Sequence, residues 1–145
     1  RIGKMPGTVQ EIRYINRDEN THLWLFRSII LELKKEEPEL FTKEKIEVYR
    51  DMIKRGVEEE IDWARYVYGD EIKGLNMNMI ESYIKYLGNL RCRGLGFEKL
   101  YEGFENEPES MKWVSEYSDP NAIKTDFFEG KPSAYSKSSV IEDDL

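Results

Sequence analysis

The 145-residue sequence contains a single cysteine, a single histidine and no apolar run of the length that a membrane span needs. Cys92 cannot form a disulfide within the chain, which fits a protein of the reducing cytoplasm. A transmembrane helix needs about 18 or more consecutive apolar residues, and a secretory leader needs a basic segment followed by an apolar one. Neither pattern is found, so we expect a cytoplasmic protein that is neither secreted nor inserted in a membrane.

Basic residues are fewer than acidic ones. The sequence has 22 lysines and arginines against 29 aspartates and glutamates, which gives a net charge of −7. This excess of acid argues against binding to nucleic-acid phosphates. The sequence shows no strand pattern, no internal repeat, no glycine-rich phosphate loop and no nucleophile elbow. With 39% hydrophobic residues, a chain of this length is expected to bury one core.

Apolar residues recur three and four positions apart over three long stretches, which predicts an all-α fold with three main helices. The predicted helices cover approximately residues 8–35, 43–68 and 76–96. Their predicted N-terminal caps are the Thr8-x-x-Glu11 capping box, Thr42 and Asn76. The pattern weakens after Gly96 to a short helix or turn around aromatic residues, and a tail without periodicity begins after Ser118.

The stretch Arg17-Asp18-Glu19-Asn20-Thr21-His22 lies in the middle of the first predicted helix and carries the clearest chemical signal. One stripe of this helix, which we call the seam, has members spaced alternately three and four residues apart: Ile12, Ile15, Glu19, His22, Phe26, Ile29 and Leu33. Such a stripe is typical of a face that helices bury against one another. Glu19 and His22 are its only polar members, and burying both is costly unless a partner such as a metal ion holds them.

Glu-x-x-His on an inward helix face is the motif with which four-helix bundles build dinuclear metal-carboxylate sites. Two helices each supply such a motif and two others each supply a carboxylate, giving about six protein ligands. This chain has one such motif, so it predicts half of a dimetal site. The alternative is that His22 is an ordinary hydrogen-bonded core residue. The acidic run Glu58-Glu59-Glu60 is better explained as a solvated face than as further metal ligands.

Several motifs together resemble one protein family, and in chain order they are Arg17-Asp18-Glu19-x-x-His22, Ile61-Asp62-Trp63-Ala64-x-Tyr66 before Gly69-Asp70, Gly74-Leu75-Asn76, Tyr83-Ile84-x-Tyr86, Asn89-x-Arg91, Asp126-Phe127-Phe128-Glu129 and Ala134-Tyr135-Ser136. They look like the C-terminal half of the small, radical-generating subunit of class I ribonucleotide reductase, and they cover nearly all of the chain. Glu-x-x-His alone would fit ferritins, hydroxylases and desaturases equally well. The acid before Glu19, the helix end at Tyr66 and the tyrosine in the tail narrow the choice.

The resemblance implies a fold and a division of the chain. Residues 1–116 would form the C-terminal half of a ferritin-like helical bundle. Residues 117–145 would form a flexible tail that docks on the large subunit of the reductase. Glu19 and His22 match the family's second Glu-x-x-His motif, so they would bind the second ion of a metal pair.

The resemblance also implies two residues on the path of the radical. Asp18 matches an acid that hydrogen-bonds the histidine of the first metal site and lies on the long-range radical path. Tyr135 matches a tail tyrosine that relays oxidising equivalents to the large subunit. The alternatives are an ordinary surface ion pair between Asp18 and Arg17, and an ordinary aromatic residue at Tyr135.

By the same resemblance, the whole protein would make a radical at a dinuclear metal centre and pass it to the large subunit, where ribonucleotides are reduced to deoxyribonucleotides. Iron is expected, with manganese or a mixed pair as alternatives because oxygen and nitrogen ligands suit both. The full small subunit is expected to be a homodimer.

The chain starts with Arg1 and lacks the family's N-terminal half, so we expect an inactive fragment. Two other interpretations stay open: a dimetal oxygenase or hydroxylase, and a non-catalytic acidic helical module that binds a partner through its tail.

Overall fold

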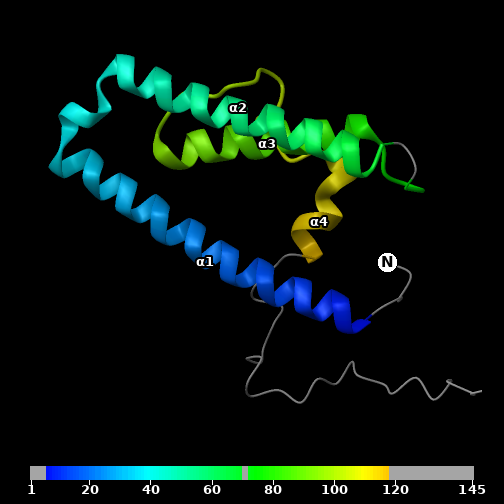
Figure 1. Ribbon diagram of the computed structural model, residues 1–145. Coiled ribbons are helices and arrows are strands. Elements are labelled where there is room, and N and C mark those ends of the chain that lie inside the picture. Colours follow the sequence, from blue (N-terminus) through cyan, green and yellow to red (C-terminus); the bar gives the residue numbers. More distant parts are fainter. Residues whose placement is uncertain (1–5, 70–71, 118–145) are drawn as a thin grey trace, which may run out of the picture. The chain divides into compact units, whose positions relative to one another are not determined.

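A computed structural model describes residues 6–69 and 72–117, and every regular element within these ranges is helical. The elements are α1 (Pro6–Glu36), the 3-10 turn η1 (Pro38–Phe41), α2 (Lys43–Val67), α3 (Met77–Leu95), the 3-10 turn η2 (Glu109–Met111) and α4 (Lys112–Tyr117), as Figure 1 shows. The predicted all-α fold is therefore confirmed for the described ranges. None of the helices found there combines the length and the apolarity that crossing a bilayer requires.

The ends of α2 and α3 are set by local hydrogen bonds that the sequence predicted. The side chain of Thr42 accepts a hydrogen bond from the backbone N–H of Lys45 at 3.4 Å, and that of Asn76 accepts one from Met79 at 3.0 Å. Each bond satisfies an N–H that has no partner inside the helix. Gly96 follows α3 with φ of 70°, the left-handed conformation that closes a helix most readily at glycine.

The start of α1 differs from the prediction. The helix begins at Pro6, so Thr8 lies inside its first turn and the predicted capping box does not mark the helix start. Proline suits a first helical position because it has no N–H to leave without a partner there. The far end is as predicted, since α1 stops at Glu36 and the chain turns at Glu37 before Pro38.

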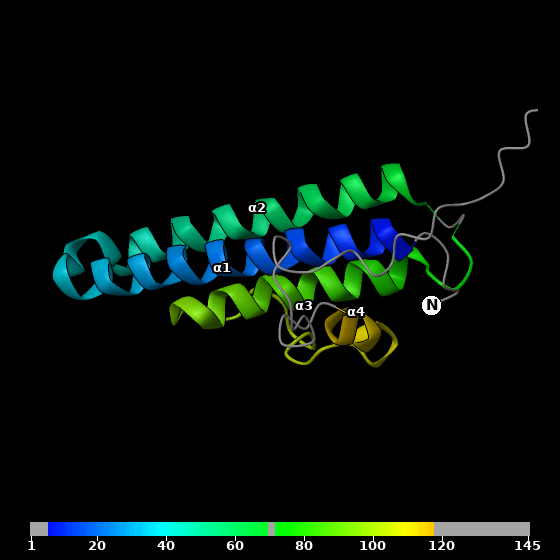
Figure 2. The same ribbon diagram turned by 90° about the horizontal axis from the view of Figure 1, so that it is seen from below.

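The core of the described region lies mainly between α2 and α3, which run antiparallel along each other (Figures 1 and 2). The buried apolar side chains are Val57, Ile61, Ala64, Ile80, Cys92, Phe97 and Met111. Gly88 permits the close approach of the two helices, because a Cβ at this position would lie 2.7 Å from Cγ2 of Val57. Burial also raises the pKa of the Cys92 thiol, which leaves that cysteine a packing residue rather than a reactive one.

The chain divides into two compact units, and the boundary falls within α1 between His22 and Leu23. In the larger unit, Leu23–Glu116, the second part of α1 is linked to the end of α3 by hydrogen bonds. The Nε group of Arg27 donates to the carbonyl oxygen of Gly94 at 2.8 Å. The ammonium group of Lys34 likewise donates to the carbonyl of Leu95 at 3.3 Å. Both cations thus meet the negative end of the α3 dipole.

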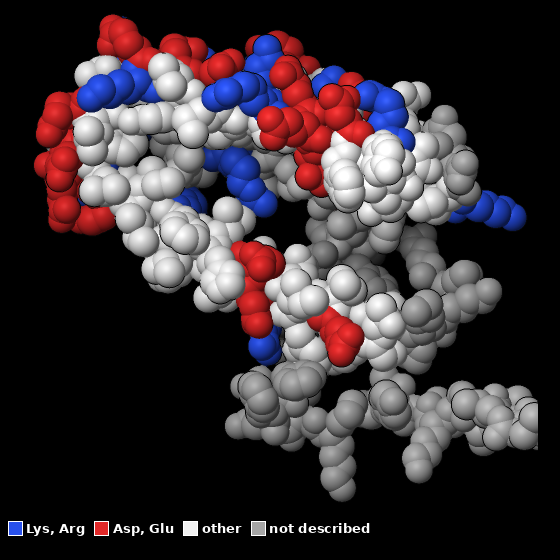
Figure 3. Space-filling view, in the orientation of Figure 1, with Lys and Arg blue, Asp and Glu red and all other residues white. Residues whose placement is uncertain are grey.

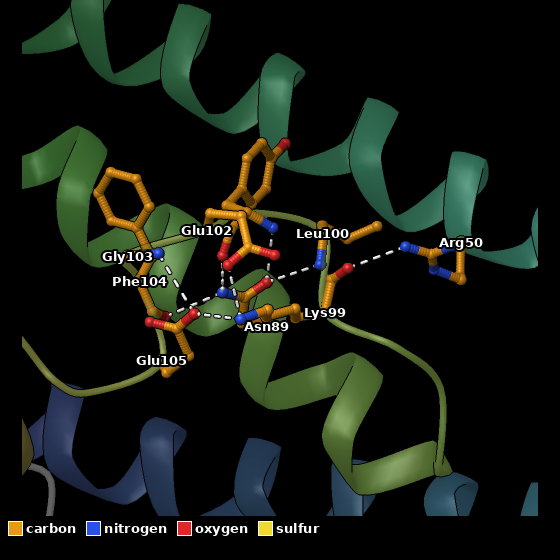
Figure 4. Close-up of polar contacts among 9 residues, drawn as sticks. Arg50, Asn89, Lys99, Leu100, Glu102, Gly103, Phe104 and Glu105 are labelled. Atoms are coloured by element: carbon orange, nitrogen blue, oxygen red, sulfur yellow. Dashed lines mark hydrogen bonds and ion pairs between the residues drawn. The ribbon is translucent and has the colours of Figure 1, made fainter.

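The segment after α3 is held by one buried amide, Asn89, whose side chain is part of the network in Figure 4. Its Oδ1 accepts hydrogen bonds from the backbone N–H groups of Leu100 at 2.8 Å and Tyr101 at 3.0 Å. Its Nδ2 donates to the carbonyl oxygens of Tyr101 at 2.7 Å and Phe104 at 3.0 Å. The predicted short helix or turn around these aromatic residues is therefore a turn, and Asn89 fixes its backbone.

Exposed acids and bases are interspersed along the outer surface of α2 (Figure 3). Ion pairs one turn apart join Arg50 to Glu47 at 2.8 Å and Arg65 to Asp62 at 2.6 Å. The run Glu58-Glu59-Glu60 is exposed at all three positions. This confirms that the acidic run belongs to a solvated face.

Candidate metal centre

Glu19 and His22 come together on α1 because residues three apart lie one turn apart on the same side of a helix. The Oε2 atom of Glu19 lies 3.6 Å from Nδ1 of His22. A carboxylate oxygen and an imidazole nitrogen at this separation can both reach one metal ion after small rotations of the side chains. The sequence-predicted pair is thus present as a pair in the structure.

Neither side chain of this pair is buried in the chain by itself. The side chain of Glu19 is 68% exposed and that of His22 is 60% exposed. The apolar members of the seam before and after them are exposed as well: Ile12, Ile15, Phe26 and Ile29. Leu33 is half-buried. The cost of desolvation, which suggested a metal partner from the sequence, therefore does not arise within the described residues.

The side chain of Asp18 contacts Arg17, whereas that of Glu19 lies beside His22. Its Oδ1 accepts a hydrogen bond from Nε of Arg17 at 3.1 Å, and the Arg17 guanidinium lies 5.4 Å from the centre of the Tyr14 ring. The hydroxyl of Tyr14 accepts a hydrogen bond from the Gln10 side chain at 3.0 Å. This is the surface ion pair that the sequence offered as one alternative for Asp18, and it holds the carboxylate beside the Glu19-His22 pair.

The donor set fits part of a metal centre and does not complete one. A neutral imidazole and a carboxylate are suitable ligands for iron, manganese or zinc. Across the described residues, however, no group of three or more His, Cys, Asp or Glu side chains is arranged to hold a metal ion. Glu19 and His22 can therefore contribute two ligands, and the remaining ligands of a closed coordination sphere would have to come from elsewhere.

Tyr135 and the tail residues 117–145 were predicted to relay the radical and to dock. Tyr135 lies outside the described residues, and so does the tail beyond Tyr117. The roles assigned to this segment and the proposed boundary between residues 116 and 117 remain predictions from the sequence.

The sequence interpretation assigned no role to Asn89, although the residue was part of the motif Asn89-x-Arg91. The structure makes it the buried centre of four hydrogen bonds, with 5% exposure. One signal was available: asparagine disfavours helix interiors, and here it lies in a helix between apolar neighbours. A polar side chain in that setting needs local partners, but its partners are 11 to 15 residues away and could not be named.

The sequence matches the family model described as "Ribonucleotide reductase, small chain" over residues 1–108. Over all 145 residues it is 67% identical to ribonucleoside-diphosphate reductase subunit beta of Treponema pallidum (strain Nichols), of which it covers 41%. Over 140 residues it is 43% identical to the subunit beta of Halalkalibacterium halodurans, of which it covers 40%. The chain therefore spans about two fifths of the length of these curated relatives.

A solved structure, the ribonucleotide reductase R2 subunit from Clostridium botulinum, is similar in fold with a TM-score of 0.75 and 48% sequence identity. The match covers 80% of this chain and 36% of that one. This similarity confirms the predicted ferritin-like helical fold. Taken with the family model and the two relatives, it shows that the chain belongs to the small-chain family of ribonucleotide reductase.

Proposed function

We propose that this chain is the part of a class I ribonucleotide reductase small subunit that carries the second Glu-x-x-His half of a dinuclear metal centre. The whole subunit would generate a radical there and pass it to a large subunit for the reduction of ribonucleotides to deoxyribonucleotides. The observation that carries the proposal is the pair of Glu19 and His22, one turn apart on α1 and 3.6 Å from each other, in a chain of this family.

In this proposal Glu19 and His22 hold the second ion of the pair, and the residues of the family that this chain lacks hold the first. The metal pair, when bound, supplies the one-electron oxidising chemistry. Iron is the metal we propose, because carboxylate and imidazole ligands suit it, and the same ligands would accept manganese. Two ligands from one helix cannot close a coordination sphere, so the chain alone is expected to be inactive.

The Asp18 carboxylate would hold and orient a histidine of the first metal site, and the motif Arg17-Asp18-Glu19-x-x-His22 supports this assignment. In the present chain its Oδ1 accepts a hydrogen bond from Arg17 instead. Tyr135 would relay oxidising equivalents from the metal bundle to the large subunit, and the acidic tail around it would dock there. The motif Ala134-Tyr135-Ser136 supports this assignment. We further propose that the whole small subunit is a cytoplasmic homodimer.

Metal loading tests the assignment of the two ligands. The 145-residue chain exposed to ferrous iron and air should lack the absorption of a dinuclear iron centre, and addition of the missing family half should restore it. Glu19→Ala and His22→Ala should each abolish the restored absorption. If the isolated chain formed a dinuclear iron chromophore in stoichiometric amount, the proposal that this chain supplies only half of the metal site would be wrong.

Turnover tests the relay and separates a reductase from an oxygenase. In a reconstituted full-length protein, Tyr135→Phe keeps the ring but removes the phenolic hydroxyl that allows the residue to be oxidised and re-reduced. Metal loading and binding to the large subunit should stay near normal while nucleotide reduction falls to background. Asp18→Asn should lower turnover too, with some effect on the adjacent metal ligand. If the Tyr135→Phe variant reduced nucleotides at the rate of the parent protein, the relay assignment would be wrong and docking would be the tail's remaining role.

A further inference from the structure

A segment without regular secondary structure, residues 98–105, is held by side chains from two different helices. We call this segment the strap. Arg50 on α2 donates from Nε to the carbonyl oxygen of Glu98 at 3.2 Å and from Nη2 to that of Lys99 at 2.8 Å. Asn89 on α3 makes all four of its hydrogen bonds to the same segment. Figure 4 shows the two side chains reaching the strap from separate helices.

The two helices meet the strap at a single peptide group. The carbonyl of this group belongs to Lys99 and accepts from Arg50, and its N–H belongs to Leu100 and donates to Oδ1 of Asn89 at 2.8 Å. A charged donor on the oxygen polarises the peptide group and strengthens the bond that its N–H donates. Both carboxylate oxygens of Glu47 accept from Nη1 of Arg50 at 2.8 Å, which orients the guanidinium. A continuous chain of hydrogen bonds therefore links α2 to α3 through the strap.

The strap covers the face of α3 on which Cys92 lies. Gly88 and Cys92 share this face because they are four residues apart. A Cβ at Gly88 would lie 3.7 Å from the side chains of both Leu100 and Tyr101 in the strap. Cys92 is 0% exposed, and the charge of the nearby Arg50 opposes the rise in thiol pKa that burial causes. The single cysteine of the chain is thus enclosed close to the point where Arg50 holds the strap.

We propose that the strap opens and closes as one unit while α2 and α3 stay folded, and that the peptide group between Lys99 and Leu100 is the latch that keeps it closed over Cys92. All of these contacts lie within the larger unit, Leu23–Glu116. None of them involves the candidate metal ligands, so the inference does not depend on the reductase function proposed above.

Contacts inside the strap favour movement as one body. The ammonium group of Lys99 lies 2.7 Å from a carboxylate oxygen of Glu102 and 2.7 Å from one of Glu105. The same oxygen of Glu105 accepts a hydrogen bond from the N–H of Gly103 at 3.2 Å. These bonds join the residue that carries the latch carbonyl to the far end of the strap. Half of the strap is exposed, namely Glu98, Lys99, Glu102 and Gly103, and segments with few buried contacts open locally at low cost.

The two helices have contacts of their own that opening would leave in place. α3 is closed before the strap begins, because the N–H groups of Gly96 and Phe97 donate to carbonyl oxygens of its last turn at 3.1 and 2.9 Å. α2 meets α3 directly where Val57 lies against Gly88. Release of the strap would therefore uncover part of α3 without removing the ends or the main contact of the helices.

Alkylation of Cys92 by iodoacetamide, followed by mass spectrometry of the 145-residue chain, tests the proposal. A fully buried thiol reacts only when the structure around it opens. Below the urea concentration of unfolding, we expect a rate of alkylation that depends much less on urea than global unfolding does, because local opening exposes less surface. A urea dependence equal to that of global unfolding would overturn the proposal, because α2 and α3 would then unfold together with the strap.

A matched pair of arginine variants tests the latch. Arg50→Met keeps the apolar stem and removes the donors, so alkylation of Cys92 should become at least about tenfold faster while the far-UV circular dichroism stays unchanged. Loss of the Arg50 charge alone would slow the reaction, because this charge favours the thiolate. Arg55→Met is the control, since Arg55 pairs with Asp51 elsewhere on α2, and it should change the rate less than about twofold. An unchanged or slower rate in Arg50→Met would overturn the latch.

Amide hydrogen exchange followed by NMR tests whether both side chains act through one peptide group. The N–H of Leu100 donates to Asn89, yet its exchange should become about tenfold faster in Arg50→Met. Combining Arg50→Met with Asn89→Ala should accelerate alkylation by less than the product of the two single effects, while the rate stays below that of the chain unfolded in urea. Unchanged exchange at Leu100, or the full product, would show two independent contacts and overturn the shared latch.

Discussion

The segment around Asn89 and the seam of α1 handle their polar groups in opposite ways. Asn89 is 5% exposed, and its amide makes four hydrogen bonds to the turn that follows α3. Glu19 and His22 are 68% and 60% exposed and lie among apolar side chains that are exposed too. Uncharged surface is correspondingly prominent along α1 in Figure 3, in contrast to the charged surface of α2.

Asn89 is thus a polar group that the fold itself satisfies, whereas Glu19 and His22 are polar groups that the fold leaves exposed. A buried amide repays its desolvation only where its partners are within reach in the same chain, and the turn after α3 provides them. An exposed contact between polar side chains contributes little to stability, so stability does not explain why a carboxylate and an imidazole interrupt an apolar stripe. The proposed metal site would explain it, because these two ligands become useful once further ligands arrive.

Breaking the amide network should have the largest effect. Asn89→Ala leaves two N–H and two C=O groups of the turn without their partner, so we expect the free energy of unfolding to fall by about 2–3 kcal/mol. Urea unfolding followed by far-UV circular dichroism measures it. Asn78→Ala is the control, since Asn78 is an exposed asparagine of the same helix, and it should change stability by less than about 0.5 kcal/mol.

Gly88→Ala should destabilise the contact between α2 and α3 by about 1–2 kcal/mol, because the new methyl group would meet Val57 at 2.7 Å. The same urea experiment applies. If the clash is the cause, the cost of Gly88→Ala should shrink in a Val57→Ala background, where the colliding methyl is gone. Strict additivity of the two substitutions would show that Gly88 is needed for another reason.

Gly56→Ala should have a smaller effect of opposite sign. Gly56 lies inside α2, and a methyl group at this position would meet nothing within 4 Å beyond the backbone of its own helix. Alanine would therefore remove backbone freedom from the unfolded chain without a clash, and we expect a gain in the free energy of unfolding of about 0.5–1 kcal/mol. A loss of stability would mean that this face of α2 is covered by a partner in solution.

Glu19→Ala and His22→Ala should have the smallest effect of all on the metal-free chain. Because both side chains are largely exposed, each change should alter the free energy of unfolding by less than about 0.5 kcal/mol. A loss of unfolding free energy comparable to that of Asn89→Ala would show that the pair is buried in solution. The two regions would then not differ in how their polar groups are satisfied.

Local signals were enough to predict much of the fold and of the candidate site. The caps at Thr42 and Asn76 were predictable because each hydrogen bond joins residues three apart. The pairing of Glu19 with His22 was predictable for the same reason. The start of α1 was missed because Pro6 and the capping box at Thr8 both signal a helix start, and the earlier one prevails.

The sequence by itself determined which stretches are helical, where α2 and α3 begin, and which two side chains form the candidate ligand pair, because these depend on bonds and spacings within one or two turns. Only the tertiary structure decided which apolar faces are covered. Phe97 is buried and Phe26 is exposed, although both belong to apolar patterns, because burial depends on which surfaces meet. The role of Asn89 was decided in the same way, through backbone groups that the turn after α3 brings back to it.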